Sequence, residues 1–355
     1  MNTGLDYTLY VGFGSPPTDY ELVIDTGSAY TWIGAAKPYV ETKTSVRQEG
    51  QKFFIKYLHG SAAGVHYKDL VTLSPSLSIA DMPFGVAAKT DATSIRIDGV
   101  LGLGPTVLGK NIVQPNNDEL VPTFMDTLLA QGKIERNVFG LSFAPATSRA
   151  VVNGELTLGG ANSQKYTGEL NWVGITENEP LNKYWGFDQV IKYGDQILQP
   201  SSAGVLDSGA TMIYITDKAF QKYSESIPGS KIDPSTELLE IPQESIDKMK
   251  SLFFYINGIS YELTPSAQIW PREFNGLMGG RKENAYYSVV NSLGNNGGDN
   301  TFNFIMGYVF MQRFYTAYDA SNSKIGFARA TASGEPVGES TSAAASRSGE
   351  TSVQK

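Results

Sequence analysis

The chain has 355 residues, of which 41% are hydrophobic, a formal net charge of −8 and no cysteine. This length suits two domains that each bury a core, and the hydrophobic content excludes a disordered chain. The acidic charge argues against a nucleic-acid partner, which needs a basic surface, and the missing cysteines exclude disulfides. No apolar run is long enough to span a membrane and no signal peptide is visible, so the sequence predicts no membrane partner.

The elements predicted along the chain are mostly β-strands. Short runs rich in Val, Ile, Tyr, Phe and Thr alternate with turns of Gly, Pro, Asn and Ser. Three short helices are also predicted, over residues 122–131, 216–223 and 242–252. Pro122 suits a first helical turn, and Thr216 suits an N-cap. The pattern therefore predicts an all-β protein with few short helices.

The chain is predicted to divide into two domains and a tail. We expect the boundary between the domains at residues 171–176. Residues 331–355 lack apolar periodicity and are rich in Ser, Ala, Gly and Glu, which predicts a disordered, solvated tail. The predicted parts are therefore residues 1–172, 173–330 and 331–355.

Two segments of the chain repeat one pattern. Residues 21–34 read ELVIDTGSAYTWIG and residues 203–216 read AGVLDSGATMIYIT, so each has two apolar residues, Asp, a hydroxyl residue and Gly. The aspartates are Asp25 and Asp207. An apolar pair followed by Gly, VLG and then IMG, comes later in each half. One such Asp segment is common in turns, but two predict a duplicated domain that presents two carboxylates to one cleft.

Two carboxylates in one cleft suit the hydrolysis of a peptide bond. An ionised carboxylate takes a proton from water, and its protonated partner donates to the carbonyl oxygen. Two carboxyl groups at close range do not both ionise easily, because their negative charges repel, so the pair titrates as a unit. No metal or organic cofactor is needed, because water is the nucleophile. Two histidines without cysteine offer no zinc site, and we predict that His59 and His66 lie on the surface.

Longer motifs support the same interpretation. They are VIDTGS followed by Trp32, FIKYLHGSAAG at 54–64, DGVLGLG, VLDSGA and FYTAYDASNSKIGFA at 314–328. On these motifs the chain resembles the pepsin-like aspartic proteases of family A1 over residues 6–329. Without cysteine and with the segment SLFFYINGISYELTPSAQIWPR, it is most similar to the fungal polyporopepsin-type branch. The resemblance implies a bilobal fold, with two β domains related by a pseudo-two-fold axis and a cleft between them.

The resemblance also implies which residues form the active site. The catalytic pair would be Asp25 and Asp207. Five neighbours would support this pair: Thr26, Gly27, Ser28, Ser208 and Gly209. Thr26 and Ser208 would cross-link the two loops, and the glycines would allow the backbone to approach the carboxylates closely. Ser28 would donate a hydrogen bond to Asp25, whereas its counterpart Ala210 has no hydroxyl.

The resemblance further implies a flap that closes over the cleft. Tyr57 would lie over the cleft with its hydroxyl held by Trp32. Gly60 and Ser61 would contact the substrate backbone. The family commonly has Gly where this chain has Leu58, so we expect flap mobility and subsite preference to differ. Four residues are expected to line the cleft beside the scissile bond: Val23, Ile95, Ile97 and Ile305.

The activity implied by the resemblance is that of an endopeptidase at acidic pH. Its substrates would be extended polypeptides, cleaved beside large apolar residues, and pepstatin-type inhibitors would bind. The family also implies a monomer that is secreted to the outside of the cell.

Other interpretations stay open at this point. A non-catalytic binding protein on the same fold is compatible with Ala210 and Leu58, although such a protein has no need of paired buried carboxylates. A carbohydrate-binding β protein would leave the repeated Asp segments unexplained. A serine triad lacks its usual Gly-x-Ser-x-Gly motif, and the Gly-x-Gly pairs lack the third Gly of a nucleotide loop.

Overall fold

The computed structural model describes residues 1–92, 97–115, 119–145, 148, 150–294 and 302–332. Ile95 and the predicted tail from residue 333 onward lie outside the described residues. The described part is mostly β with few short helices, as the sequence predicts. None of its helices is long and apolar enough to cross a membrane. Within it, no group of three or more His, Asp or Glu residues is placed to hold a metal ion.

An eight-stranded sheet in the first half of the chain carries the first Asp segment. Its strand order is β1-β2-β7-β3-β6-β5-β4-β8. The strands are β1 (Thr8–Phe13), β2 (Thr18–Asp25), β3 (Trp32–Ile33), β4 (Val46–Lys56), β5 (Ser61–Ser74), β6 (Leu77–Thr90), β7 (Gly99–Gly102) and β8 (Val113–Gln114). Strands β2 and β7 run parallel, which places Asp25 at the end of β2 beside Gly102 at the end of β7.

A seven-stranded sheet carries the second Asp segment, in the order β18-β17-β12-β13-β21-β14-β20. The strands are β12 (Gly186–Tyr193), β13 (Gln196–Leu206), β14 (Ile213–Ile215), β17 (Leu252–Ile256), β18 (Ile259–Leu263), β20 (Val290–Ser292) and β21 (Phe304–Met306). Strands β13 and β21 also run parallel, with Leu206 beside Met306. Three short strands form a further sheet: β15 (Lys231–Ile232), β16 (Leu239–Ile241) and β19 (Tyr286–Tyr287).

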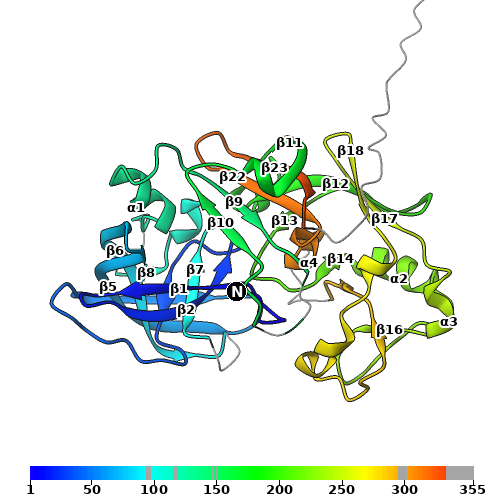
Figure 1. Cartoon of the computed structure of the whole chain (residues 1–355), viewed down its shortest axis with the longest axis horizontal. Coiled ribbons are helices and arrows are strands. Elements are labelled where there is room, and N and C mark those ends of the chain that lie inside the picture. The colour runs from blue at the N-terminus through cyan, green and yellow to red at the C-terminus, as the bar shows by residue number, and fades with distance from the viewer. Residues whose placement is uncertain (93–96, 116–118, 146–147, 149, 295–301, 333–355) are drawn as a thin grey trace, which may run out of the picture.

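A five-stranded sheet, β10-β9-β22-β23-β11, combines strands from both halves of the chain. The strands are β9 (Val138–Ser142), β10 (Glu155–Leu158), β11 (Tyr166–Gly174), β22 (Phe314–Asp319) and β23 (Lys324–Ala330). In Figure 1, β1, β2 and β5–β8 lie on the left, β12–β14 and β16–β18 lie on the right, and this sheet lies above and between them. The predicted boundary between residues 172 and 173 falls inside β11 and stays a prediction.

Two of the three predicted helices form close to the predicted places. Helix α1 (Phe124–Ala130) begins after Thr123, whose hydroxyl accepts from the Asp126 N–H (3.1 Å), while the Asp126 carboxylate accepts from the Thr123 N–H (3.0 Å). Helix α2 (Asp217–Glu225) begins after the predicted N-cap Thr216. Short 3₁₀ helices span Thr106–Gly109, Ser163–Lys165, Leu181–Lys183, Ser266–Gln268 and Arg272–Met278.

The third predicted helix, at 242–252, is much shorter than expected. Helix α3 spans only Gln243–Ile246, and Leu252 begins strand β17. There Leu252 pairs with Tyr193 of β12 and with Leu263 of β18. These pairings between distant parts of the chain outweigh the local helical pattern. One further helix, α4 (Tyr308–Met311), follows the Gly of the second apolar-apolar-Gly segment and was not expected from the sequence.

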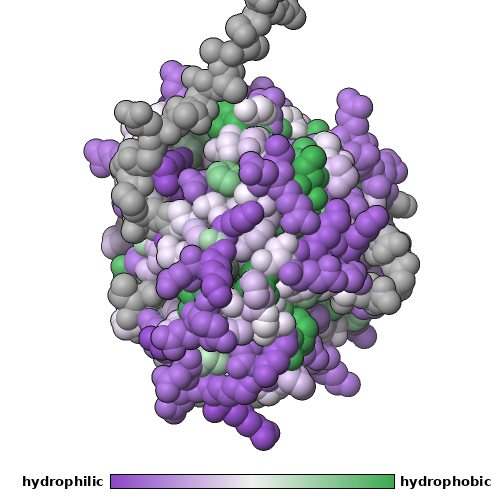
Figure 2. Space-filling view, turned by 90° about the vertical axis from the view of Figure 1, so that its right-hand side faces the viewer, coloured by the Kyte–Doolittle hydropathy of each residue, from purple (hydrophilic) through white to green (hydrophobic). Residues whose placement is uncertain are grey.

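The surface offers little contiguous apolar area on the side shown in Figure 2, where hydrophobic residues are scattered among polar ones. The large hydrophobic side chains that are exposed anywhere on the described part include Ile197, Ile232 and Ile259. Apolar residues that are exposed singly are normal on a soluble surface and mark no docking site.

His66 is buried, which corrects the prediction that it lies on the surface; His59 is exposed, as predicted. The Nδ1 atom of His66, on β5, lies 2.7 Å from the hydroxyl of Tyr30, which belongs to the first Asp segment. The ring of Tyr30 also packs near Phe53, with ring centroids 5.3 Å apart. Burial, with a smaller contribution from Lys68, lowers the pKa of His66 to about 4. His66 therefore supports the first Asp segment from within the sheet as a neutral side chain.

We expect His66→Gln to reduce the loss of stability on acidification. The pKa of a histidine in an unfolded chain is about 6.5, so the unfolded chain takes up a proton before the folded chain does. The stability that depends on neutral His66 is therefore full above about pH 6.5, falls by about 3 kcal/mol between there and the folded pKa of about 4, and changes little below it. Denaturant unfolding at pH 7 and pH 4 measures this change, with His59→Gln as the exposed control. Equal pH dependence in His66→Gln and the parent protein would contradict the assignment.

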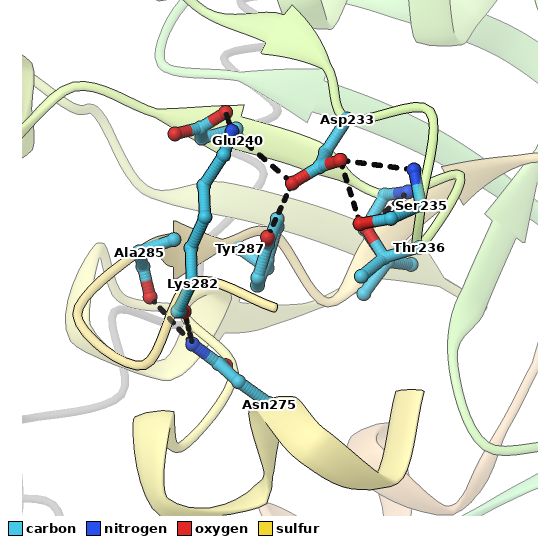
Figure 3. A network of polar contacts seen from close by, with 9 residues as sticks. Asp233, Ser235, Thr236, Glu240, Asn275, Lys282, Ala285 and Tyr287 are labelled. Atoms are coloured by element: carbon cyan, nitrogen blue, oxygen red, sulfur yellow. Dashed lines mark hydrogen bonds and ion pairs between the residues drawn. The ribbon is translucent and has the colours of Figure 1, made fainter. Parts of the chain in front are cut away.

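A polar network centred on Asp233 ties the three-stranded sheet together (Figure 3). Asp233 is buried, and its Oδ2 accepts from the Tyr287 hydroxyl (2.6 Å) and lies 3.2 Å from Lys282 Nζ. Lys282 also donates to Glu240 Oε2 (2.6 Å). The Asp233 Oδ1 accepts from the N–H (2.9 Å) and the hydroxyl (2.8 Å) of Ser235. These hydrogen bonds, that of Tyr287 above all, hold the pKa of Asp233 well below its usual range.

Asp233→Asn should lower the melting temperature at pH 7 and lower it much less at pH 2. A carboxylate whose pKa is depressed by folding adds stability above its unfolded pKa, about 3.9, and this stability is lost as the pH falls toward the folded pKa. Calorimetry at the two pH values measures the difference. Glu240→Gln, which removes only the partly exposed partner of Lys282, is the control and should change less. A loss of equal size at both pH values would argue against the role of the ionised form.

Candidate active site

The two Asp segments occupy equivalent places in their sheets. Asp25 ends β2 beside β7, and its carbonyl accepts from the Leu103 N–H (2.7 Å). Asp207 follows β13 beside β21, and its N–H donates to the Met306 carbonyl (3.0 Å). In each half, the apolar-apolar-Gly strand thus runs alongside the strand that delivers the aspartate. The repeat in the sequence is therefore a repeat in structure.

The two loops are joined by four hydrogen bonds arranged symmetrically between Thr26 and Ser208. The Thr26 N–H donates to Ser208 Oγ (3.0 Å), and the Ser208 N–H donates to Thr26 Oγ1 (2.9 Å). Each hydroxyl then donates across the junction, from Thr26 to the Leu206 carbonyl (3.1 Å) and from Ser208 to the Ile24 carbonyl (2.7 Å). Both side chains are completely buried, so water does not compete for these bonds.

Two glycines allow the carboxyl groups to meet. A Cβ atom on Gly27 would lie 2.6 Å from the carboxyl atoms of Asp207, and one on Gly209 would lie 2.7 Å from Asp25 Oδ1. The N–H of Gly27 donates to Asp25 Oδ1 and that of Gly209 to Asp207 Oδ1, each at 2.8 Å. The two carboxyl groups are then near enough for the charge of Asp207 to raise the pKa of Asp25. A side chain at either glycine would therefore push the pair apart.

The electrostatics of the pair favour one proton between two carboxyl groups. Burial raises the pKa of Asp25 well above its usual range, and the charge of Asp207 raises it further. Burial also raises the pKa of Asp207, against the N–H groups that donate to it. The Ser28 hydroxyl donates to Asp25 Oδ2, whereas in the described part of the chain Asp207 receives no side-chain hydroxyl. The missing hydroxyl of Ala210 thus leaves the pair asymmetric.

The predicted flap is the hairpin of β4 and β5. Its turn is closed by a hydrogen bond from the Tyr57 N–H to the Gly60 carbonyl (3.0 Å), with Gly60 in the left-handed region at φ +82°. The Trp32 Nε1–H donates to the Tyr57 hydroxyl (2.7 Å), the contact implied by the resemblance. Leu58 at the tip is 54% exposed. Ser61 hydrogen bonds to Asp91, so its contact with substrate backbone stays a prediction.

The predicted lining residues fall into two small apolar clusters, separate from the main core. Val23 and Ile97 belong to the cluster that contains Trp32 and packs against Tyr57. Ile305 belongs to a second cluster, with Leu181, Ala203 and Val205, that packs against Ala210. Each cluster therefore adjoins one of the two Asp loops. Ile95 lies outside the described residues.

Sequence reasoning missed two supports of this site. Tyr30 lies inside the repeated segment, but its partner His66 is on another strand, so no local pattern marks the pair. Asp91 and Thr90 hold the base of the flap across a similar separation in sequence. A polar residue placed just before an exposed turn is too common a pattern to identify either of them.

Comparisons with known proteins identify the family and the fold. Residues 6–330 match the family model described as eukaryotic aspartyl protease. Polyporopepsin from Irpex lacteus is 41% identical over 328 residues, covering 92% of this chain and 95% of that protein. Cathepsin E from Rattus norvegicus is 25% identical over 346 residues, covering 92% and 80%. The crystal structure of the aspartic proteinase from Irpex lacteus superimposes with a TM-score of 0.89 at 40% identity, covering 94% and 96% of the two chains.

The family and its fold, predicted from the repeated Asp segments, are thereby confirmed, as is the similarity to a fungal relative. Such coverage leaves no room for a carbohydrate-binding β protein of another family. The chain belongs to the eukaryotic aspartyl protease family, the pepsin-like family A1, and is an aspartic endopeptidase that acts on polypeptides.

Proposed function

We propose that Asp25 and Asp207 are the catalytic pair. The observation that carries this proposal is the meeting of two buried carboxyl groups across the Thr26–Ser208 junction. The ionised member takes a proton from a water molecule, which attacks the scissile carbonyl carbon. The protonated member donates to the carbonyl oxygen. Because the two groups titrate as a unit, the proton belongs to the pair and not to either residue.

We propose that the flap closes over the substrate with Tyr57 held by Trp32. The Nε1–H of Trp32 fixes the Tyr57 hydroxyl at 2.7 Å, so the ring is oriented before substrate arrives. Closure of a flap excludes bulk water and strengthens the interactions within the site. Gly60 and Ser61 remain candidates for substrate contact in this proposal.

We propose that the protein cleaves beside large apolar residues of an extended polypeptide. The support is chemical: Val23 and Ile97 on one side and Ile305 on the other form apolar clusters against the two Asp loops. A protein that binds an extended peptide usually recognises it through pockets that receive alternate side chains. The matching proposal for the whole molecule is a monomer of two lobes, residues 1–172 and 173–330, secreted and inhibited by pepstatin-type compounds.

A non-catalytic role on the same fold is disfavoured by the site itself. Ala210 and Leu58 are the departures that could suggest it. A binding protein gains nothing from two buried carboxyl groups, because burial raises the pKa of both and costs stability. The support for catalysis is therefore the presence of this costly pair.

Asp25→Asn and Asp207→Asn should each lower kcat on a peptide substrate at least about 1,000-fold, because either change removes half of the acid–base pair. Each variant should keep its fold, since an amide fits the same space. Steady-state kinetics and circular dichroism check the two expectations. Substantial turnover by either folded variant would rule out the pair, and with it the proposed mechanism.

Ala210→Ser should extend activity to lower pH. A hydroxyl that donates to the ionised form of Asp207 lowers the first pKa of the pair, by up to about one unit. That pKa sets the acidic limb of kcat/KM, which should move down accordingly. Ser28→Ala removes the hydroxyl on the other side and should move the limb up. Profiles of pH against rate on one synthetic peptide test both, and limbs that stay in place would mean that water already supplies the donor.

Digestion of a denatured protein mixture should yield cleavage sites flanked mostly by Leu, Phe, Ile, Met, Tyr or Trp. The apolar clusters beside the Asp loops are expected to favour such side chains by removing them from water. Mass spectrometry of the fragments locates the sites, and the Asp25→Asn protein supplies the blank. Cleavage distributed evenly over polar and apolar residues would contradict the proposed preference.

A further inference from the structure

The flap is fastened to the rest of its sheet by side chains at the end of β6. The ladder between β5 and β6 ends with the pair Ala62 and Thr90. The next residue toward the flap tip is Ser61, and the next residue along the other strand is Asp91. A regular strand pair would stop here and leave the Ser61 N–H without a partner on this side.

Asp91 supplies that partner with its carboxylate. Its Oδ1 accepts from the Ser61 N–H (2.7 Å) and from the Ser61 hydroxyl (3.1 Å). In return, the Ser61 carbonyl accepts from the Asp91 N–H (3.1 Å) and from the Thr90 hydroxyl (3.0 Å). Both backbone polar groups of Ser61 are thus engaged on the β6 side. Hydrogen bonds from an N–H to an ionised carboxylate are stronger than those to a neutral acceptor.

Two further contacts strengthen this junction. The Thr90 hydroxyl also accepts from the Ala92 N–H (3.1 Å), which fixes the direction of the chain through Asp91. Gly60 approaches so closely that a Cβ atom there would lie 2.4 Å from the Asp91 carbonyl oxygen. Only the four residues Tyr57, Leu58, His59 and Gly60 therefore extend beyond the fastened part of the hairpin.

We propose that Asp91 is a positioning residue of the flap. By fixing Ser61, its carboxylate sets the base from which Tyr57 reaches the Trp32 Nε1–H, so the flap is held near its closed position before substrate binds. This inference rests on the proposed role of the flap in catalysis. The ordering of the flap is then complete before binding, and substrate does not have to supply that free energy.

Asp91→Ala tests the proposal. We expect faster amide hydrogen exchange at Ser61, by about tenfold or more, because its acceptor is gone. We also expect KM for a peptide substrate to rise about fivefold to tenfold while kcat changes less than about twofold. The reason is that substrate binding must then supply the free energy that orders the flap. Glu49→Ala is the control, since Glu49 is an exposed carboxylate on the same hairpin whose ion pair is with Arg47, at 3.8 Å.

Two milder variants keep the test decisive if Asp91→Ala does not fold. Asp91→Asn keeps an acceptor oxygen without the charge, so it should restore most of the Ser61 protection and give an intermediate KM. Thr90→Val keeps the shape of Thr90 but removes the hydroxyl that donates to Ser61, and it should shift both readouts in the direction of Asp91→Ala.

The outcomes separate this inference from the proposed catalytic function. Unchanged exchange at Ser61 in the Asp91 variants would overturn it, as would faster exchange with an unaltered KM. An equal rise in KM for Glu49→Ala would also overturn it, because the effect would then follow charge and not the tether. If the unmodified protein showed no peptidase activity, the proposed function alone would be refuted. The hydrogen-exchange measurement would still show whether Asp91 holds Ser61.

Discussion

The structure depends on two carboxyl groups being held next to each other in a buried place. Separate carboxylates would remain in water, where each ionises freely, because burial and mutual repulsion both cost free energy. Here the hydrogen bonds between Thr26 and Ser208 join the two loops and so keep Asp25 and Asp207 next to each other. The folding free energy of the two large sheets offsets the unfavourable burial of the two carboxyl groups. The result is a pair that shares one proton.

The same constraint explains why the surrounding residues are small or apolar. Gly27 and Gly209 stand where a Cβ atom would displace a carboxyl group. Strand β7 pairs with β2 beside the first loop, and strand β21 pairs with β13 beside the second. Both strands place buried apolar residues against their loops. The chain thus builds the same support twice, which is how one short pattern can position two groups that come from distant parts of the sequence.

The two halves are equivalent in backbone but different in the groups that surround the carboxylates. On the Asp25 side, a hydroxyl from Ser28, the flap residue Tyr57 and the buried Tyr30–His66 pair all lie close to the loop. On the Asp207 side, backbone N–H groups are the main donors. An asymmetric environment is useful for a pair in which one member must be ionised and the other protonated.

Part of this protein could be predicted from its sequence because the signals are local. The repeated Asp segments, the apolar-apolar-Gly strands and the N-cap of α2 each involve residues within a few positions of one another, and the resemblance to a known family rests on such motifs. Other features were decided only by tertiary structure. His66 can be buried because its ring nitrogen has a hydrogen-bond partner in the Tyr30 hydroxyl. Helix α3 ends early because Leu252 pairs with residues of β12 and β18. Asp91 bonds to Ser61 across 30 positions of sequence, and Tyr287 bonds to Asp233 across 54. Hydrophobic period and turn chemistry report on a residue's immediate neighbours, whereas burial and hydrogen-bond partners of a polar side chain depend on which distant strand folds against it.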